Sequence, residues 1–266
     1  MYLINRKKSL GQNFLLDQNI IRKIVSIGNI NKKSIVLEVG PGTGNLTREI
    51  VKQEPKKIYA VEKDKTLSLK LNNLFHNQEI IEIINNDILE VDESSISDAK
   101  IIVFGNLPYN ISTQILAKWI LLNKWPPWYS SLVLMFQKEV ADRILAKSKS
   151  KNYGRLAVLS NWRLKIKKHF NISRNCFFPK PKVDSTLLSF VPVNKHKYPL
   201  QNPTNLEKIT RIFFSNRRKM INKNFSKIFK KNSSLPKKLD LNLNLRPGDL
   251  DYAIYYKLAQ HYENLF

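Results

Sequence analysis

The sequence predicts an α/β fold: a mostly parallel, seven-stranded sheet covered by helices, followed by a small all-helical domain. Through the first two-thirds of the chain, short apolar runs rich in β-branched residues alternate with helix-compatible segments. Such alternation indicates βαβ units and a parallel sheet. After a stretch rich in Pro and Asn, residues 192–204, the remaining segments are helix-like. We therefore expect one domain over residues 1–195 and a second over residues 203–266.

Seven runs have the length and composition of strands. The first five are 35–39, 58–62, 80–84, 101–104 and 131–136, and the last two are 162–168 and 186–192. Helices are expected between the early strands, at 44–53, 65–76, 112–123 and 138–147, and in the C-terminal part, at 205–215, 218–230 and 249–263. The prolines of "FFPKPKVDS", 177–185, exclude a helix there and indicate a fixed loop between the last two strands.

Composition excludes several classes of protein. The single cysteine, Cys176, permits no internal disulfide. The histidines lack metal-ligand spacing, so no metal site is expected; they are His76, His169, His196 and His261. Apolar runs stay well below the roughly 20 residues that span a bilayer, and the N-terminal segment lacks the apolar core of a secretory signal. A cytoplasmic protein is the expectation.

The net charge of +24, from 45 basic and 21 acidic residues, predicts a polyanionic partner. Nucleic acid is the simplest such partner. Abundant Lys, Asn and Ile also fit an A/T-rich genome, so part of the lysine excess has an explanation without function. Because both parts of the chain are basic, no single tail accounts for the charge.

A glycine-rich turn follows the first expected strand, in "VLEVGPGTGNLT", 36–47. Gly40, Gly42 and Gly44 let the backbone turn tightly and approach a ligand closely. The dinucleotide fingerprint would need a small residue where Asn45 stands. With Glu38 two residues ahead, the turn instead resembles the cofactor loop of methyltransferases that use S-adenosylmethionine (SAM).

Carboxylates stand at the next two strand ends, where ligands collect in open parallel sheets. Glu62 would accept hydrogen bonds from the ribose hydroxyls of the cofactor, and Asp87 from its adenine amino group. Each residue alone also fits a helix N-cap or a solvated loop acid. Three such features at successive strand ends favour a cofactor site.

The fourth strand ends in "NLPY", 106–109, which resembles the motif of methyltransferases that modify exocyclic amines. Such an amine is a poor nucleophile because its lone pair is delocalised into the ring. On this interpretation the Asn106 side-chain oxygen and the Leu107 carbonyl would accept its hydrogens, while Pro108 would fix the backbone. Tyr109 would stack on a flipped base. The alternative is an ordinary proline turn.

The whole chain resembles the ribosomal RNA adenine dimethyltransferases. The resemblance rests on "SLGQNFLLD" (9–17), "EVGPGTGNLT" (38–47), "VEKD" (61–64), "NNDIL" (85–89), "FGNLPYNIS" (104–112), "MFQKEVADRI" (135–144), "YGRL" (153–156) and "FFPKPKVDS" (177–185). It implies a Rossmann-like SAM-dependent methyltransferase domain before the helical domain. It also implies dimethylation of two adjacent adenosines near the 3′ end of 16S ribosomal RNA, within the immature small subunit, by a monomer.

Site residues follow from the same resemblance. It places Asn13, Leu15, Gly40, Gly42, Glu62, Asp87 and Asn106 at the cofactor. Phe177 becomes the second stacking face for the target base, although the sequence alone favours a core residue there. The "QKEVADR" segment, which ends at Arg143, becomes an exposed helix that lines an RNA groove.

The segment "SNRRKMINKNF", 215–225, is expected to contact RNA phosphates through Arg217, Arg218, Lys219 and Lys223; a solvated charge run is the alternative. Three other functions remain open: a large-subunit methyltransferase that confers macrolide resistance, a non-enzymatic nucleic-acid-binding relative, and a DNA adenine methyltransferase. The sequences of the "NLPYNIS" and "YGRL" motifs are more similar to those of the small-subunit branch of the family.

Overall fold

The computed structural model describes residues 12–195, 197–229 and 234–265. The first three residues of the "SLGQNFLLD" motif, residue 230 of the expected helix 218–230, and His196 lie outside this range. The chain divides into two compact units. The first comprises Met1–Ile115, Pro127–Ala141 and Ile166–Pro192, and the second comprises Leu116–Pro126, Asp142–Lys165 and Val193–Phe266.

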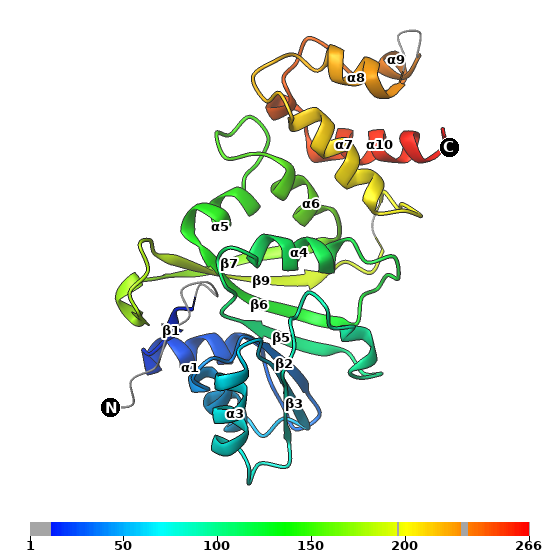
Figure 1. Cartoon of the computed structure of the whole chain (residues 1–266). Helices are drawn as coiled ribbons and strands as arrows, with labels where there is room; N and C mark the ends of the chain where they lie inside the picture. Colours follow the sequence, from blue (N-terminus) through cyan, green and yellow to red (C-terminus); the bar gives the residue numbers. More distant parts are fainter. Residues whose placement is uncertain (1–11, 196, 230–233, 266) are drawn as a thin grey trace. The chain divides into compact units, whose positions relative to one another are not determined.

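One seven-stranded sheet organises the first unit, in the order β4-β3-β2-β5-β6-β9-β7 (Figure 1). Its strands are β2 (Ile35–Val39), β3 (Lys57–Val61), β4 (Ile81–Ile84), β5 (Ile101–Gly105), β6 (Tyr129–Gln137), β7 (Leu164–Ile172) and β9 (Ser185–Pro192). The pairs β3–β4, β2–β3, β2–β5 and β5–β6 are parallel, and β6 and β9 are antiparallel. The predicted mostly parallel α/β fold is confirmed, and each of the seven expected runs contributes a strand.

Both faces of the central strands are buried. Val36, Ile58 and Phe104 share one face with the apolar side chains of two helices. Leu37 and Val103, which alternate with them, are also fully buried on the opposite face. Strands buried on both sides need near-continuous apolar runs, and this is why β2 reads Ile-Val-Leu-Glu-Val with one exception, Glu38.

The helices that accompany the sheet follow the expected positions, with one addition. They are α2 (Asn45–Val51), α3 (Lys65–Leu74), α4 (Ser112–Ile120) and α5 (Lys138–Ile144). The additional helix, α1 (Gln18–Ile27), starts where the Asp17 side chain accepts from the N–H groups of Asn19 and Ile20. Its buried residues Ile21, Ile24 and Val25 have the helical spacing that predicts an amphipathic helix.

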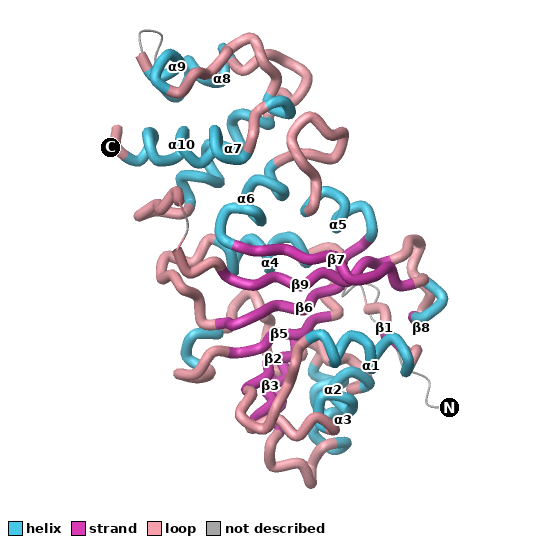
Figure 2. The backbone as a smooth tube through the Cα atoms, turned by 180° about the vertical axis from the view of Figure 1, so that it is seen from behind, coloured by secondary structure: helices cyan, strands magenta, loops and turns pink. Residues whose placement is uncertain are grey.

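The second unit is mainly helical. Its elements are α6 (Arg155–Arg163), α7 (Thr204–Phe214), α8 (Asn222–Phe229), α9 (Leu235–Lys238) and α10 (Tyr252–Glu263), with the short 3₁₀ turn η4 (Pro247–Asp249). In the tube view of Figure 2, α7 and α10 run side by side, as their packing requires. The Tyr256 hydroxyl donates to the Val158 carbonyl at 3.0 Å and joins α10 to α6.

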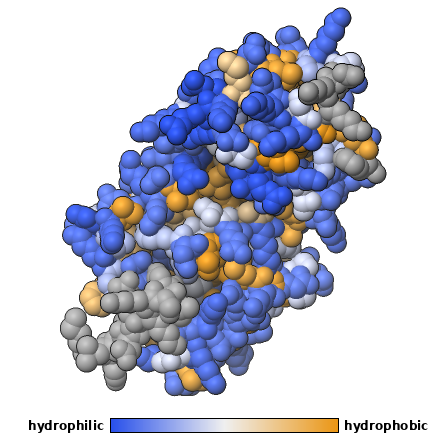
Figure 3. Space-filling view, turned by 45° about the horizontal axis from the view of Figure 1, so that its top comes forward, coloured by the Kyte–Doolittle hydropathy of each residue, from blue (hydrophilic) through white to orange (hydrophobic). Residues whose placement is uncertain are grey.

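These units differ from the expected domains 1–195 and 203–266, because α6 packs with α7 and α10 although it precedes β7 in the chain. The assignment of the two segments as a catalytic and an RNA-binding domain stays a prediction. Over the described part of the chain, no helix combines the length and apolar character that crossing a bilayer requires. Figure 3 shows a mostly hydrophilic face with scattered apolar residues.

Candidate active site

A pocket opens in the first unit where parallel strands end side by side. Val39, the last residue of β2, pairs with Val61 of β3 and with Gly105 of β5. The loops that leave these three strands therefore start together. The pocket is lined by these loops, by residues 12–15 and by the loop after β4, and its lining includes Asn13, Leu15, Gly40, Gly42, Glu62, Asp87, Asn106, Leu107, Pro108 and Tyr109.

The glycine-rich turn takes a backbone path that other residues adopt only with strain. Gly40, Gly42 and Gly44 have φ values of 70°, 59° and 78°. A Cβ at Gly42 would lie 2.8 Å from the Phe14 ring, which also lines the pocket. The missing side chain therefore keeps this wall of the pocket open.

Glu62 follows β3 directly and joins two of the loops. Its Oε2 accepts from the Gly42 N–H at 3.1 Å, and its Oε1 accepts from the Asp64 N–H at 2.8 Å. Burial raises the pKa of Glu62, while these backbone hydrogen bonds oppose the rise. Each carboxylate oxygen keeps a lone pair for a further donor, which suits recognition of a vicinal diol.

Glu38 is the one charged side chain within β2 and is 1% exposed. Burial raises its pKa to about 7; the nearby Thr47 hydroxyl opposes this rise, and the charge of Glu62 adds to it. The Thr47 hydroxyl is thus close to the carboxyl group, but among the described residues Glu38 Oε2 has no partner that meets hydrogen-bond geometry. A buried carboxyl oxygen without a partner, at the wall of a pocket, fits a site that takes a polar or cationic ligand.

Asp87 lies in the loop after β4. One carboxylate oxygen accepts from the Leu89 N–H at 3.0 Å, and the other pairs with Lys63 Nζ at 2.6 Å. Lys63 also lines the pocket, and its pKa is raised because of Asp87. A ligand amine that approaches Asp87 must therefore share this carboxylate with Lys63.

The Asn106 amide is held in one orientation. Its Nδ2 donates to the backbone carbonyl of Asn13 at 2.7 Å. Because a carbonyl only accepts, this contact identifies the nitrogen and leaves Oδ1 as the atom available for a ligand. Asn106, predicted to be catalytic, and Asn13, predicted to bind the cofactor, are thus in direct contact, although 93 positions separate them in the sequence.

The rest of the "NLPY" segment is also fixed. The Leu107 side chain is buried, 1% exposed, and fills the space beside Gly105. The Pro108 carbonyl accepts from the N–H groups of Ile111 and Ser112 and begins the turn into α4. No described residue donates a backbone hydrogen bond to the Leu107 carbonyl. It therefore remains an acceptor beside Asn106.

Tyr109 is half-buried, and its hydroxyl lies 2.7 Å from Ser185 Oγ. Ser185 is fully buried at the start of β9 and ends the "FFPKPKVDS" segment. Burial raises the pKa of Tyr109, with a further increase from the charge of Asp184, so the hydroxyl stays protonated. This contact joins two motifs that the sequence shows only as separate segments.

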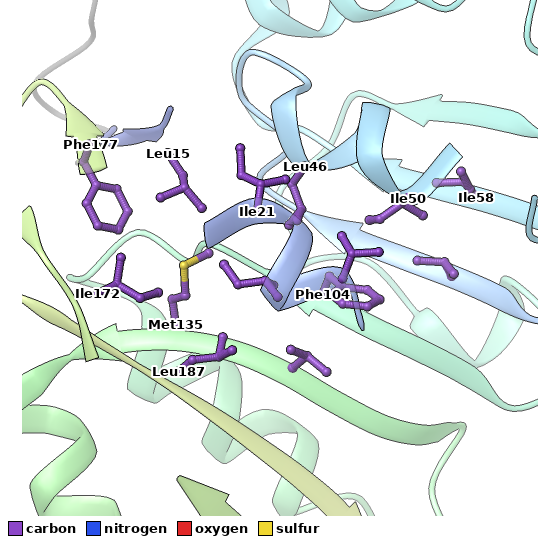
Figure 4. Packing of buried hydrophobic residues seen from close by; sticks show 14 residues of the cluster. Leu15, Ile21, Leu46, Ile50, Ile58, Phe104, Met135, Ile172, Phe177 and Leu187 are labelled. Atoms are coloured by element: carbon purple, nitrogen blue, oxygen red, sulfur yellow. The ribbon is translucent and has the colours of Figure 1, made fainter. Parts of the chain in front are cut away.

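Phe177 differs from the role that the resemblance gives it. It pairs with Leu15 in a two-stranded sheet formed by β1 (Phe14–Leu15) and β8 (Phe177–Phe178). Phe177 is 4% exposed and packs in the core cluster with Leu15 and Ile172 (Figure 4), and it is not itself among the residues that line the pocket. The packing matches the core residue that the sequence alone favours.

The exposed aromatic residue of this segment is instead Phe178, with 54% of its surface accessible. Phe178 pairs with Phe14 across the small sheet. Residues directly opposite in a strand pair project from the same face. Phe178 therefore shares a face of the small sheet with Phe14, and Phe177 shares the other face with Leu15; both Phe14 and Leu15 line the pocket, so exposure is what distinguishes the two rings.

The predicted RNA contacts lie outside the pocket lining. Arg143 is exposed on α5, and Lys223 is exposed on α8. Arg217, Arg218 and Lys219 are exposed in the turn between α7 and α8. Of these, Arg217 is engaged: its guanidinium donates to the backbone carbonyls of Ser150 and Lys151.

Several supporting residues escape sequence reasoning. Asn45 donates to the Leu15 carbonyl at 2.9 Å, and Asn85 donates to the Glu62 carbonyl at 2.8 Å. Ser185 and Thr47 complete the set. These residues act through neighbours distant in sequence, so a local pattern carries no signal for them. Within the described ranges, no cluster of three or more His, Cys, Asp or Glu side chains has the arrangement of a metal site.

Comparison with known proteins agrees with this geometry. The chain matches the family model "Ribosomal RNA adenine dimethylase" over residues 4–263. It is 54% identical over 262 residues to the ribosomal RNA small subunit methyltransferase A of Pelagibacter ubique, with 98% of each chain covered. It is 40% identical to the Wolbachia protein of the same name, with 100% of this chain and 96% of the relative covered.

Solved structures show the same fold. A dimethyladenosine transferase from Plasmodium falciparum aligns with a TM-score of 0.78 and 27% identity, over 94% of this chain and 98% of that one. The 23S rRNA methyltransferase ErmE aligns with a TM-score of 0.68 and 20% identity, over 94% and 99% of the two chains. With a family model that covers nearly all its length, and with the pocket that the motifs predict, the chain belongs to the ribosomal RNA adenine dimethylase family.

Proposed function

We propose that this enzyme dimethylates two adjacent adenosines near the 3′ end of 16S ribosomal RNA, as a step in maturation of the small ribosomal subunit. The relative with 54% identity is named as a small-subunit enzyme and is matched over 98% of both chains. Its substrate is the immature subunit, and the enzyme acts as a cytoplasmic monomer. The observation that carries the proposal is the Asn106 amide, which presents an oriented acceptor in the pocket.

The pocket residues fit SAM as the cofactor. Glu62 offers two oxygens to the ribose hydroxyls, and Asp87 offers one to the adenine amino group. Gly40 and Gly42 leave room for the methionine part, beside the unpartnered oxygen of Glu38. Asn13 and Leu15 form the wall of the pocket from the N-terminal side. When bound, SAM supplies a methyl group on a positively charged sulfur.

The chain's own contribution is to position the nucleophile. Asn106 Oδ1 and the Leu107 carbonyl accept the two hydrogens of the adenine amine, which favours a more tetrahedral nitrogen. The amine held in this way would take up the methyl group that SAM, held by the pocket residues, would supply. The nitrogen releases its proton to solvent afterwards. No covalent enzyme intermediate is needed, so alignment is the main source of rate, and Cys176 has no role as a nucleophile.

The target base must leave its stack to reach the pocket. Tyr109, fixed by Ser185, provides one aromatic face for the flipped base. Because Phe177 is buried and Phe178 is exposed, we assign the second face to Phe178. Away from the pocket, Arg143, Arg218, Lys219 and Lys223 contact RNA phosphates.

Incubation with labelled SAM and small subunits that lack the modification tests the proposal. The expected result is label on two adjacent adenosines near the 3′ end of 16S RNA, each carrying two methyl groups. Label on large-subunit RNA in a parallel reaction would instead identify the macrolide-resistance type of enzyme. An absence of transfer to any RNA, with SAM binding retained, would favour a non-enzymatic relative, and preferential transfer to DNA would indicate a DNA methyltransferase.

A further inference from the structure

A lysine-rich loop in the second unit has no role in the pocket. The segment "KSKSK", 147–151, connects α5 and α6 and carries Lys147, Lys149 and Lys151 at every second position. All three lysines are exposed, and the structure records no ion pair between them and any described residue. Three positive charges without an acidic partner mark a surface for an anion.

The backbone of this loop is tied to the C-terminal part of the same unit. The Lys149 N–H donates to the Gly248 carbonyl at 2.7 Å, in the turn before α10. Ser148 Oγ donates to Asp251 Oδ1. The other nearby acid, Asp249, accepts from the Arg246 N–H at 3.0 Å. Among the described residues, the structure records no ion pair between either acid and the loop lysines.

Arg217 holds the other end of the loop. Its guanidinium donates to the carbonyls of Ser150 and Lys151, and the Ser150 hydroxyl donates to the Lys147 carbonyl at 2.6 Å. The oxygen atoms of main-chain carbonyls carry partial negative charge and would repel a phosphate. Arg217 offsets this at two of them, the carbonyls of Ser150 and Lys151, by donating hydrogen bonds to them. The loop is thus ordered before any partner binds, so a partner incurs less entropy loss on ordering it.

Lys149 adopts a backbone conformation with φ of 68°. A residue with a Cβ is disfavoured in this region, whereas Gly adopts it freely and Asn and Asp tolerate it. Of the other described non-glycine residues with positive φ, Asn29 and Asp240 follow this rule and Glu54 does not. Lys149 does not follow it. The backbone alone would favour Gly here, so a change of Lys149 to Gly removes the charge without straining the turn.

We propose that Lys147, Lys149 and Lys151 form a preordered loop that contacts the phosphate backbone of the substrate RNA, with Arg217 as its brace. The inference rests on the proposed function, which makes RNA the substrate, and adds the surface that binds it. It also changes the role of Arg217: its guanidinium supports the loop, and the neighbouring Arg218 and Lys219 stay free to contact phosphates themselves.

Lys149→Gly separates charge from fold, because Gly suits the local backbone. We expect a melting temperature equal to or above that of the wild type, weaker binding to unmodified small subunits, and a salt slope lower by about 0.7–0.9. The triple variant Lys147→Ala/Lys149→Gly/Lys151→Ala should lower the slope by about three times as much. Binding is measured at constant Mg²⁺ over a series of salt concentrations. The control is Lys70→Ala, an exposed lysine of α3 in the first unit, which should leave the slope unchanged.

The role of Arg217 as a brace of the loop leads to a second expected result. Arg217→Ala should weaken binding in the wild-type background and have little further effect in the triple variant, because both changes remove the same loop contact. A folded Lys149→Gly variant with wild-type affinity and salt slope overturns the proposal, as does full additivity of Arg217→Ala with the triple variant. Methylation mapping on the wild-type enzyme distinguishes failure of the loop proposal from failure of the proposed function. If the wild-type enzyme transfers methyl groups to 16S RNA while the loop variants bind normally, the proposed function holds and only the role of the loop is wrong.

Discussion

The hydroxyl of Tyr109, in the turn after β5, lies 2.7 Å from Ser185 Oγ, at the start of β9, although 76 positions separate the two residues in the sequence. The hydrogen bond to Ser185 holds the Tyr109 ring at its hydroxyl end, while the preceding residue, Pro108, fixes the backbone. A ring anchored at both ends has little freedom to turn, and Tyr109 is one of the residues that line the pocket. We therefore treat Ser185 as a positioning residue that acts through Tyr109.

Ser185→Ala should lower the single-turnover methylation rate about 10-fold, which corresponds to ~1.36 kcal/mol. Tyr109→Phe keeps the ring but loses the same hydrogen bond, so it should show a similar loss. The double variant should be no slower than either single variant, because one contact cannot be lost twice. Ser185→Thr, which keeps the hydroxyl, serves as the control and should recover much of the rate. Losses that multiply in the double variant would show that the two residues act independently.

Asn106→Ala removes the oriented amide oxygen and leaves the Leu107 carbonyl in place. The single-turnover rate at saturating SAM should fall at least 100-fold, about 2.7 kcal/mol at ~1.36 kcal/mol per decade. RNA affinity should change little, since phosphate contacts elsewhere dominate it. Asn106→Asp is the matched variant: it keeps an acceptor but cannot donate to the Asn13 carbonyl, so it too should be slow. A near-normal rate for Asn106→Ala would mean that the amide does not orient the nucleophile.

Glu62→Ala should weaken SAM binding by roughly 1.5–3 kcal/mol, the range for hydrogen bonds to a charged group. The carboxylate also holds the N–H groups of Gly42 and Asp64, so its loss loosens the cofactor loop as well. Calorimetry on a folded variant measures the effect. Glu82→Ala, at a half-exposed acid of β4, provides a control of equal charge and should bind SAM normally. Unchanged affinity in Glu62→Ala would remove Glu62 from the site.

Glu38 should make stability and cofactor binding depend on pH in opposite directions. Its pKa rises on folding from 4.5 to about 7, so between these values the folded chain keeps a proton that the unfolded chain has lost. Stability therefore falls as pH rises through this window, by about 3 kcal/mol in total. Glu38→Gln should remove most of this slope in denaturation experiments; the raised pKa of Glu62 contributes a remainder of the same sign.

SAM carries positive charge, so its affinity for the wild-type enzyme should increase as Glu38 ionises between about pH 6 and about pH 8. The Glu38→Gln variant should bind SAM with a flatter pH dependence. Calorimetry at several pH values measures both curves. Parallel curves for the two proteins would show that the Glu38 charge does not reach the cofactor.

Phe177 and Phe178 should separate stability from catalysis. Phe177→Ala opens a cavity in the core and should cost about 3–5 kcal/mol of stability. Phe177→Leu, which keeps most of the volume, should retain the wild-type rate. Phe178→Ala should keep the melting temperature and lower the single-turnover rate through poorer stacking of the base. The reverse pattern, a folded Phe177→Leu with a large rate loss, would restore Phe177 as the stacking face and require its ring to leave the core.

The strand pattern, the glycine turn, Glu62, Asp87 and "NLPY" are all local features, and the sequence alone was sufficient to predict them. Apolar runs identify buried strands because burial on both faces leaves no room for polar residues. The parallel connections then bring the strand ends to one edge of the sheet, so residues at those ends are expected to share a pocket. The family resemblance rests on the same segments.

Tertiary structure decided what depends on contacts between distant segments. The Asn106–Asn13 and Tyr109–Ser185 contacts join segments that no local pattern relates, and the pKa of Glu38 follows from its burial. The pairing of β1 with β8 turns Phe177 into the core and Phe178 outward, because alternate residues of a strand face opposite sides. Sequence specifies which residues occur at strand ends; which of their atoms remain available to a ligand depends on the neighbours that folding brings to them.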